Sequence, residues 1–104
     1  MDLRSLNKEN DMNLKQLALA AADYYDVSYD KLNSPCRQAE YTRPRHICHW
    51  VAAERYTKAE IARFWNIDRT AVYYGCKMVQ GRINTSKQER KDIKAFIRHA
   101  RKWA

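Results

Sequence analysis

The sequence predicts a small all-α domain in which several helices surround one core. Apolar side chains recur at the three- and four-residue spacing of amphipathic helices, and no segment shows the alternation of a β-strand. The 104-residue chain contains only two glycines and two prolines, and 45% of its residues are hydrophobic. That composition is typical of a compact helical protein, and the length allows one hydrophobic core but not two independent ones.

The first helix is expected over residues 13–26, after a flexible N-terminal arm of residues 1–12 that mixes charged and amide side chains. The helix carries an apolar stripe at i, i+3, i+4 and i+7 spacing. The stripe consists of Leu14, Leu17, Ala18, Ala21 and Tyr25. A short second helix is expected over residues 29–33, with Ser28 as its N-cap.

Two prolines limit the next segment. Because the residue before a proline avoids the helical conformation, the second helix should end before Pro35. Residues 35–41 are expected to form a loop. The third helix should begin around residues 42–44, with Pro44 at the first helical position, where no amide donor is lost. The side chains expected to face the core are those of Ile47, Trp50 and Val51.

Two capping boxes, at Thr57–Glu60 and Ser86–Glu89, mark the starts of two further helices. The first should run from residue 58 for about two turns and end at Asn66, because asparagine tolerates the left-handed conformation well. Asp68 can cap the helix between the two boxes. The inward stripe of that helix consists of Val72, Cys76, Val79 and Ile83. The apolar face of the last helix consists of Ile93, Phe96, Ile97, Ala100 and Trp103, so all three tryptophans are spaced as core residues.

The net charge of +8 is unevenly placed along the chain. Residues 1–34 carry four basic and six acidic side chains, whereas residues 35–104 carry sixteen and six. Such an excess favours polyanionic partners, nucleic acid most commonly, with an anionic membrane as the alternative. No apolar run approaches the ~20 residues that span a bilayer, so no transmembrane helix is expected.

Neither a secretory leader nor a metal site is expected. The N-terminus lacks the apolar segment of a signal peptide, and the cysteines are odd in number, so we expect reduced thiols in a cytoplasmic, nucleoid-associated protein without a disulfide. His46 and His49 share a helix face but lack the paired spacing of a structural zinc site. We expect Cys48 and Cys76 in the core and Cys36 as a surface thiol. We expect no cofactor and no catalytic residue.

Residues 57–77 have the pattern of a helix-turn-helix, which is a short helix, a tight turn and a second helix with a polar face. Ala62 suits a close helix crossing, Asn66 the turn, and Ile67 and Val72 the core beneath it. The outward face of the second helix carries Arg69, Thr70, Tyr73, Tyr74 and Lys77. Such a face suits the DNA major groove, where arginine reads guanine and a threonine methyl meets thymine. The alternative is an ordinary helical hairpin with a solvated polar face.

Three motifs occur in a familiar order and spacing. They are Tyr25-Asp26-Val27-Ser28 followed by Leu32, Arg43-Pro44-Arg45-His46, and Asp68-Arg69-Thr70-Ala71-Val72 followed by Cys76-Lys77. Through these motifs, residues 13–103 resemble the C-terminal, origin-box-binding domain (domain IV) of the bacterial replication initiator DnaA. The resemblance implies that residues 13–104 form a Trp-repressor-like helix-turn-helix domain that binds double-stranded DNA.

The resemblance also implies roles for single residues. Arg37 matches a minor-groove arginine, Arg45 and Lys77 match phosphate contacts, and His46 stands where a phosphate-binding glutamine is usual. Residues 68–71 stand at the base-reading turn. Asp68 has two roles open to it, capping the helix and accepting from a cytosine amino group. Tyr73 and Tyr74 either contact the DNA backbone or pack on neighbouring helices. The expected DNA-binding residues are Arg37, Arg43, Arg45, His46, Thr57, Asp68, Arg69, Thr70, Ala71, Tyr73, Tyr74 and Lys77.

Departures from the family pattern affect the target and the activity. Arg69, Ala71 and Tyr74 replace the signature His, Thr and His, so the preferred site should differ from the standard box. The sequence contains no G-x-x-x-x-G-K-[ST] motif, and no ATPase activity is expected. We expect a monomer or weak dimer, not an enzyme, that acts in replication control or transcription, of the kind that phages or mobile elements carry. The alternative is a protein-interaction module that antagonises a host replication or transcription protein.

Overall fold

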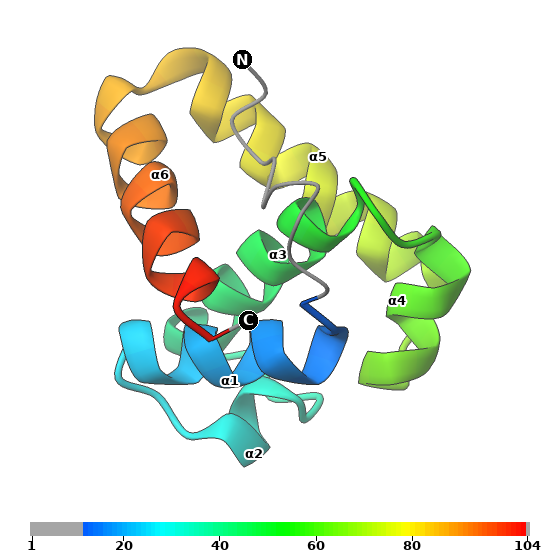
Figure 1. Cartoon of the computed structure of the whole chain (residues 1–104). Helices are drawn as coiled ribbons and strands as arrows, with labels where there is room; N and C mark the ends of the chain where they lie inside the picture. The colour runs from blue at the N-terminus through cyan, green and yellow to red at the C-terminus, as the bar shows by residue number, and fades with distance from the viewer. Residues whose placement is uncertain (1–11, 104) are drawn as a thin grey trace.

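A computed structural model of the protein describes residues 12–103, which form six helices and no strand (Figure 1). The helices are α1 (Leu14–Tyr24), α2 (Tyr29–Leu32), α3 (Ala39–Ala52), α4 (Lys58–Trp65), α5 (Arg69–Thr85) and α6 (Lys87–Arg101). The prediction of an all-α domain is confirmed. None of the described helices is both long and apolar enough to cross a membrane.

The residue that begins the described part of the chain, Met12, belongs to the core. Met12 is buried at 3% exposure, whereas residues 1–11 of the expected arm lie outside the described residues. Asn13 caps α1 by accepting from the amide of Gln16 at 2.8 Å, and the Gln16 side chain accepts the Asn13 amide in return. The helix ends earlier than predicted, because Asp26 adopts the left-handed conformation with φ 54°.

The third helix begins three residues before the predicted Thr42, so the expectation that Pro44 occupies its first position was wrong. Residues 39–41 continue the helix backwards because Tyr41 is buried and anchors the added turn. Pro44 then lies inside the helix and withholds an amide from the carbonyl of Glu40. Glu40 is exposed, so water can satisfy this carbonyl. The short α2 agrees with prediction, with the Ser28 hydroxyl accepting from Lys31.

The single core centres on α3, which packs against both α1 and α5. The predicted inward residues Ile47, Trp50 and Val51 are all buried, and the indole of Trp50 donates to Gln80 of α5 at 3.0 Å. The largest fully buried apolar side chains are those of Phe96, Leu17, Leu32, Ile61 and Ile93. Trp103 was predicted wrongly as a core residue, because it follows the end of α6 and is 37% exposed. Cys76, also expected in the core, is half-buried and packs against it.

The second predicted capping box is only half formed. The Ser86 hydroxyl accepts from the amide of Glu89 at 3.1 Å. The amide of Ser86, however, already donates to the backbone carbonyl of Arg82 as the last hydrogen bond of α5, so it does not donate to the Glu89 carboxylate. That carboxylate pairs with Arg82 instead, at 3.3 Å. One residue therefore ends α5 and starts α6, and the chain reverses sharply between these two helices (Figure 1).

Candidate nucleic-acid interface

The helix-turn-helix predicted from the sequence is present as α4, a three-residue turn and α5. The Thr57–Glu60 capping box starts α4 with both of its bonds formed. Asn66 ends the helix in the left-handed conformation, with φ 56° and ψ 50°. Ala62 is buried, and its carbonyl accepts the Ile67 amide at 2.9 Å, which closes the turn. The turn thereby sets the start of α5 at the edge of the molecule, beside α4 (Figure 1).

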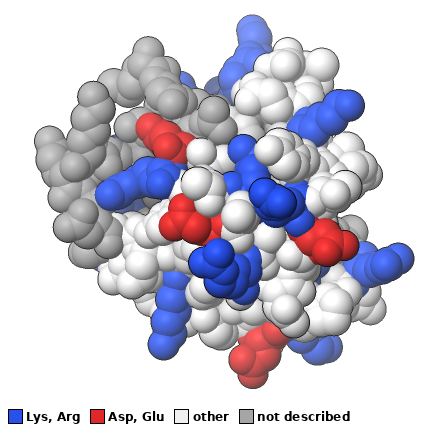
Figure 2. All heavy atoms as spheres, turned by 90° about the vertical axis from the view of Figure 1, so that its right-hand side faces the viewer, with Lys and Arg blue, Asp and Glu red and all other residues white. Residues whose placement is uncertain are grey.

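The first turns of α5 present the predicted polar face to solvent. Val72 is fully buried beneath the helix, and Ile67 packs against the same core. Tyr73 and Tyr74 are 60% and 58% exposed. The other exposed side chains of this face are those of Arg69, Thr70, Ala71 and Lys77. Lys and Arg side chains are spread over this side of the molecule, among uncharged surface and a few carboxylates (Figure 2).

Asp68 occupies the N-cap position of α5, as predicted, but its side chain makes no capping hydrogen bond. The sequence allowed two roles for this side chain, capping of α5 and a contact with a cytosine amino group, and the capping bond is not formed in the structure. The carboxylate is exposed at the end of the helix, next to Arg69 and Thr70.

A shallow hollow of about 590 Å³ lies where α3 meets the start of α5. It is lined by His46, Ile67, Asp68, Thr70, Ala71 and Tyr74. The ring of His46 reaches it because α5 carries glycine at position 75: a Cβ built there would lie 2.8 Å from the Cδ2 atom of His46. Tyr74 meets the same imidazole edge-on, with ring centroids 6.0 Å apart. One residue of α3 thus joins the surface formed by the start of α5.

The electrostatics of His46 differ from those of an exposed histidine. Burial lowers the pKa of its imidazole, and the neighbouring Arg82 and Arg45 lower it further. The ring is therefore neutral near pH 7. A phosphate contact by His46 would be made by a neutral N–H donor.

Arg45 does not lie where a phosphate contact requires it. It is only 7% exposed, and its guanidinium points into the α2–α3 corner. Nε donates to the carbonyl of Leu32 at 2.6 Å, Nη1 to Cys36 at 3.0 Å and Nη2 to Lys31 at 3.1 Å. These carbonyls lie at the C-terminal end of α2 and in the segment that follows, so Arg45 caps α2 and fixes the segment that carries Arg37. The expected phosphate contact is corrected to a positioning role.

The remaining predicted residues are distributed over three places. Arg37 is exposed between α2 and α3. Arg43 is exposed on α3, but its guanidinium is directed toward α6, 3.8 Å from Glu89, and away from the start of α5. Thr57 is exposed at the start of α4 and is engaged in the capping box. Cys36, expected as a surface thiol, is half-buried instead.

Sequence reasoning missed the packing of His49 under α4. His49 is 1% exposed, and its ring meets that of Trp65 edge-on at 4.7 Å between centroids. Neither ring nitrogen finds a hydrogen-bond partner among the described residues, and burial lowers the pKa of His49 to about 3. Its spacing from the core residues of α3 was the available signal. Among residues 12–103, no three histidine, cysteine or acidic side chains are grouped so as to hold a metal ion.

Comparison with known proteins agrees with this geometry. Residues 14–79 match the family described as the bacterial dnaA protein helix-turn-helix. The chromosomal replication initiator protein DnaA of Flavobacterium psychrophilum is 26% identical over 91 residues, which cover 84% of this chain and 19% of that protein. The chain thus spans about a fifth of the length of this relative. The matched region includes α1 to α4 and the part of α5 that bears the exposed polar face.

Proposed function

The chain belongs to the bacterial DnaA helix-turn-helix family, and on that premise we propose that it recognises a specific double-stranded DNA sequence through the start of α5. The observation that carries this proposal is the open N-terminal end of that helix. Asp68 makes no capping bond there, and Arg69 and Thr70 are exposed beside it. The first residues of a recognition helix are those that usually meet base edges in the major groove.

Each side chain at this end has chemistry that suits a base edge. The planar fork of Arg69 matches guanine O6 and N7 together, and the Asp68 carboxylate can accept from the amino group of cytosine. Ala71 and Thr70 line the hollow with methyl groups, which suit the methyl of thymine. The preferred site should therefore contain a guanine read by Arg69, with a thymine beside it.

Phosphate and minor-groove contacts would hold the helix in register. Lys77, one turn beyond Tyr73, is exposed and charged and suits a phosphate. Arg37 projects from the segment that Arg45 fixes through the carbonyl of Cys36, and it is proposed to enter the minor groove. Arg45 would then act on DNA only indirectly, by holding the segment that presents Arg37.

The biological role proposed for this binding is control of replication or transcription by occupation of initiator-like sites. The three departures at the reading surface, Arg69, Ala71 and Tyr74, all lie at the exposed start of α5. They therefore alter base selection without disturbing the core beneath.

Selection from a pool of randomised duplexes tests the proposal directly. The wild-type chain is expected to enrich one motif, with a guanine at the position that Arg69 reads. The matched control is Arg69→Ala/Thr70→Ala, which removes reading groups and leaves Val72 and the core intact. If the wild type enriches no motif, or if the control enriches the same motif, the proposal fails. Loss of all enrichment with retained binding to a replication protein would favour a protein-interaction module instead.

A further inference from the structure

A row of basic side chains runs along the outward face of α6. Lys87, Lys91, Lys94 and Arg98 follow one another at four-, three- and four-residue steps, which keep them on one side of a helix, and all four are exposed. We call these four residues the α6 stripe. At 1.5 Å per residue it is about 16 Å long. The opposite face of α6 is buried in the core through Ile93, Phe96, Ile97 and Ala100.

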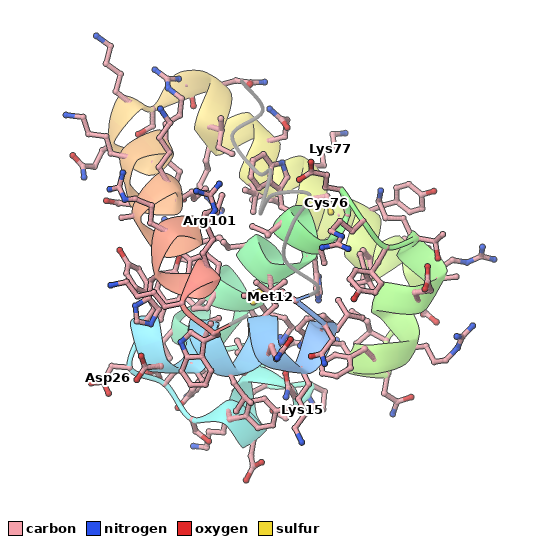
Figure 3. All side chains as sticks on the ribbon, viewed as in Figure 1. Met12, Lys15, Asp26, Cys76, Lys77 and Arg101 are labelled. Carbon is pink, nitrogen blue, oxygen red and sulfur yellow. The ribbon has the colours of Figure 1, made fainter. Side chains whose placement is uncertain are left out.

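The stripe is not neutralised within the described part of the chain. Lys91, Lys94 and Arg98 make no hydrogen bond or ion pair with residues 12–103. The two carboxylates of α6 are engaged elsewhere: Glu89 pairs with Arg82 and Arg43, and Asp92 accepts from Gln88 at 2.9 Å. Side chains with long stems and terminal nitrogens extend outward from α6 into solvent (Figure 3).

Helix stability gives no reason for this arrangement. Like charges three and four residues apart repel one another, at a cost of about 0.2–0.5 kcal/mol per pair. The helix dipole favours positive charge at the C-terminal end of α6, which accounts for Arg98, but it disfavours Lys87 in the first turn. Residues 87–102 nevertheless carry seven basic and two acidic side chains, a surplus of five in a chain whose net charge is +8.

The α6 stripe lies away from the proposed reading end of α5. In Figure 1, α6 forms the left side of the molecule, and α4 with the start of α5 forms the right side. The Cα extents of the molecule are 31 × 30 × 26 Å. DNA bound at the start of α5 would therefore leave the α6 stripe open to solvent on the other side.

We propose that the α6 stripe binds the phosphate backbone of a second DNA duplex, so that one chain holds two DNA segments together. A linear row of cations suits a charged polymer and reads no sequence. A membrane surface fits less well, because the apolar face of α6 is buried and offers nothing to insert between lipids. Bridging rests on the proposed function, because α5 holds the first duplex, whereas the phosphate contact of the α6 stripe does not depend on what α5 reads.

A bridging assay tests the inference. A duplex carrying the selected motif is immobilised and loaded with protein, and capture of a labelled duplex without the motif is then measured. The variant Lys94→Glu/Arg98→Glu is expected to lower the affinity for the second duplex about tenfold and to leave the affinity for the first within about threefold, because the two contacts are independent. The control Lys15→Glu/Lys31→Glu changes the net charge equally, at exposed positions of α1 and α2. It removes the contact of Lys31 with the Tyr41 ring, 5.6 Å from the ring centroid, and should leave capture nearly unchanged.

Three outcomes would overturn the inference. The wild type captures no second duplex, or the control variant loses as much capture as Lys94→Glu/Arg98→Glu does. In the third, Lys94→Glu/Arg98→Glu loses binding to phosphatidylserine vesicles but keeps duplex capture. Circular dichroism melting of both variants shows whether they fold. The two proposals fail separately. If α5 reads no sequence, the Arg69→Ala/Thr70→Ala variant is still expected to bind a single duplex through the α6 stripe. That binding should weaken with salt, and adding Lys94→Glu/Arg98→Glu should abolish it.

Discussion

The inner side of α3 and the outer side of α5 both carry polar and charged residues, and the fold treats the two sets in opposite ways. On α3, Arg45 and His49 are 7% and 1% exposed and are enclosed by the fold. On α5, the side chains of Arg69 and Lys77 are exposed. The comparison teaches that residue type and motif position do not decide whether a basic side chain serves stability or binding. The carbonyls and rings that surround it do.

Replacing Arg45 should have the largest effect of all, and that effect should be a loss of stability. Arg45→Ala leaves the carbonyls of Leu32, Cys36 and Lys31 without their donor, and we expect a loss of about 2–4 kcal/mol in the free energy of unfolding. Urea denaturation measures it. Arg45→Lys should recover little, since one ammonium group cannot serve three carbonyls spread over the guanidinium plane. A stable Arg45→Ala variant that merely loses DNA affinity would break the comparison and restore the phosphate contact.

Acidification should act on the inner side of α3 through His49. Its pKa of about 3 in the fold lies below the ordinary value of 6.5, so the unfolded chain binds a proton that the folded chain does not. Stability is therefore full above pH 6.5 and falls as the pH drops toward 3, by at most about 1.4 kcal/mol per pH unit.

His49→Phe isolates this contribution, because the phenyl ring keeps the edge-on contact with Trp65 and cannot be protonated. Between pH 6.5 and 5, above most carboxylate pKa values, the variant should lose less stability than the wild type. Parallel stability curves for the two proteins would contradict the low pKa of His49.

Replacing Arg69 should affect the outer side of α5 alone. Arg69→Ala is expected to cost about 1–3 kcal/mol of DNA-binding free energy at the guanine position and to leave unfolding within about 0.5 kcal/mol. Arg69→His, which restores the family residue, should change the selected motif at that position. If both variants keep the wild-type motif and only the overall affinity drops, Arg69 contacts a phosphate.

Gly75 connects the two sides, because it lets His46 of α3 reach the surface of α5. In Gly75→Ala the new Cβ would meet the imidazole at 2.8 Å, and the expected cost in stability is about 1–2 kcal/mol from overpacking. Combining Gly75→Ala with His46→Ala should restore part of the lost stability, which thermal melts of the single and double variants can measure. Without such recovery, the close approach of the two helices does not depend on this contact.

The smallest effect is expected at Lys77. Lys77→Ala should weaken DNA binding on all sequences alike and reduce the slope of log affinity against log salt by about 1, because one phosphate loses its counter-charge. Titration of one duplex at several salt concentrations gives the slope. A change in the selected motif would instead place Lys77 among the base-reading residues.

Local sequence signals determined most of the fold and the exposed start of α5. The Thr57–Glu60 capping box, the left-handed Asn66 and the N-cap position of Asp68 each depend on a few consecutive residues, and all three lie where the sequence predicts. The exposed face of α5 followed from the spacing of Val72 and Val79, because a helix that buries one stripe must expose the opposite one.

Tertiary structure alone decided which polar groups are hydrogen-bonded within the fold and which stay exposed. The carbonyls that hold Arg45 lie 9 to 14 residues away along the chain, so no local pattern reveals them. The Ser86 amide had a second acceptor in the preceding helix, which left the second capping box half formed. Trp103 has core spacing, but α6 ends before it. In each case the partner belongs to another element or to a helix end, and only the packed chain brings these groups together or leaves them exposed.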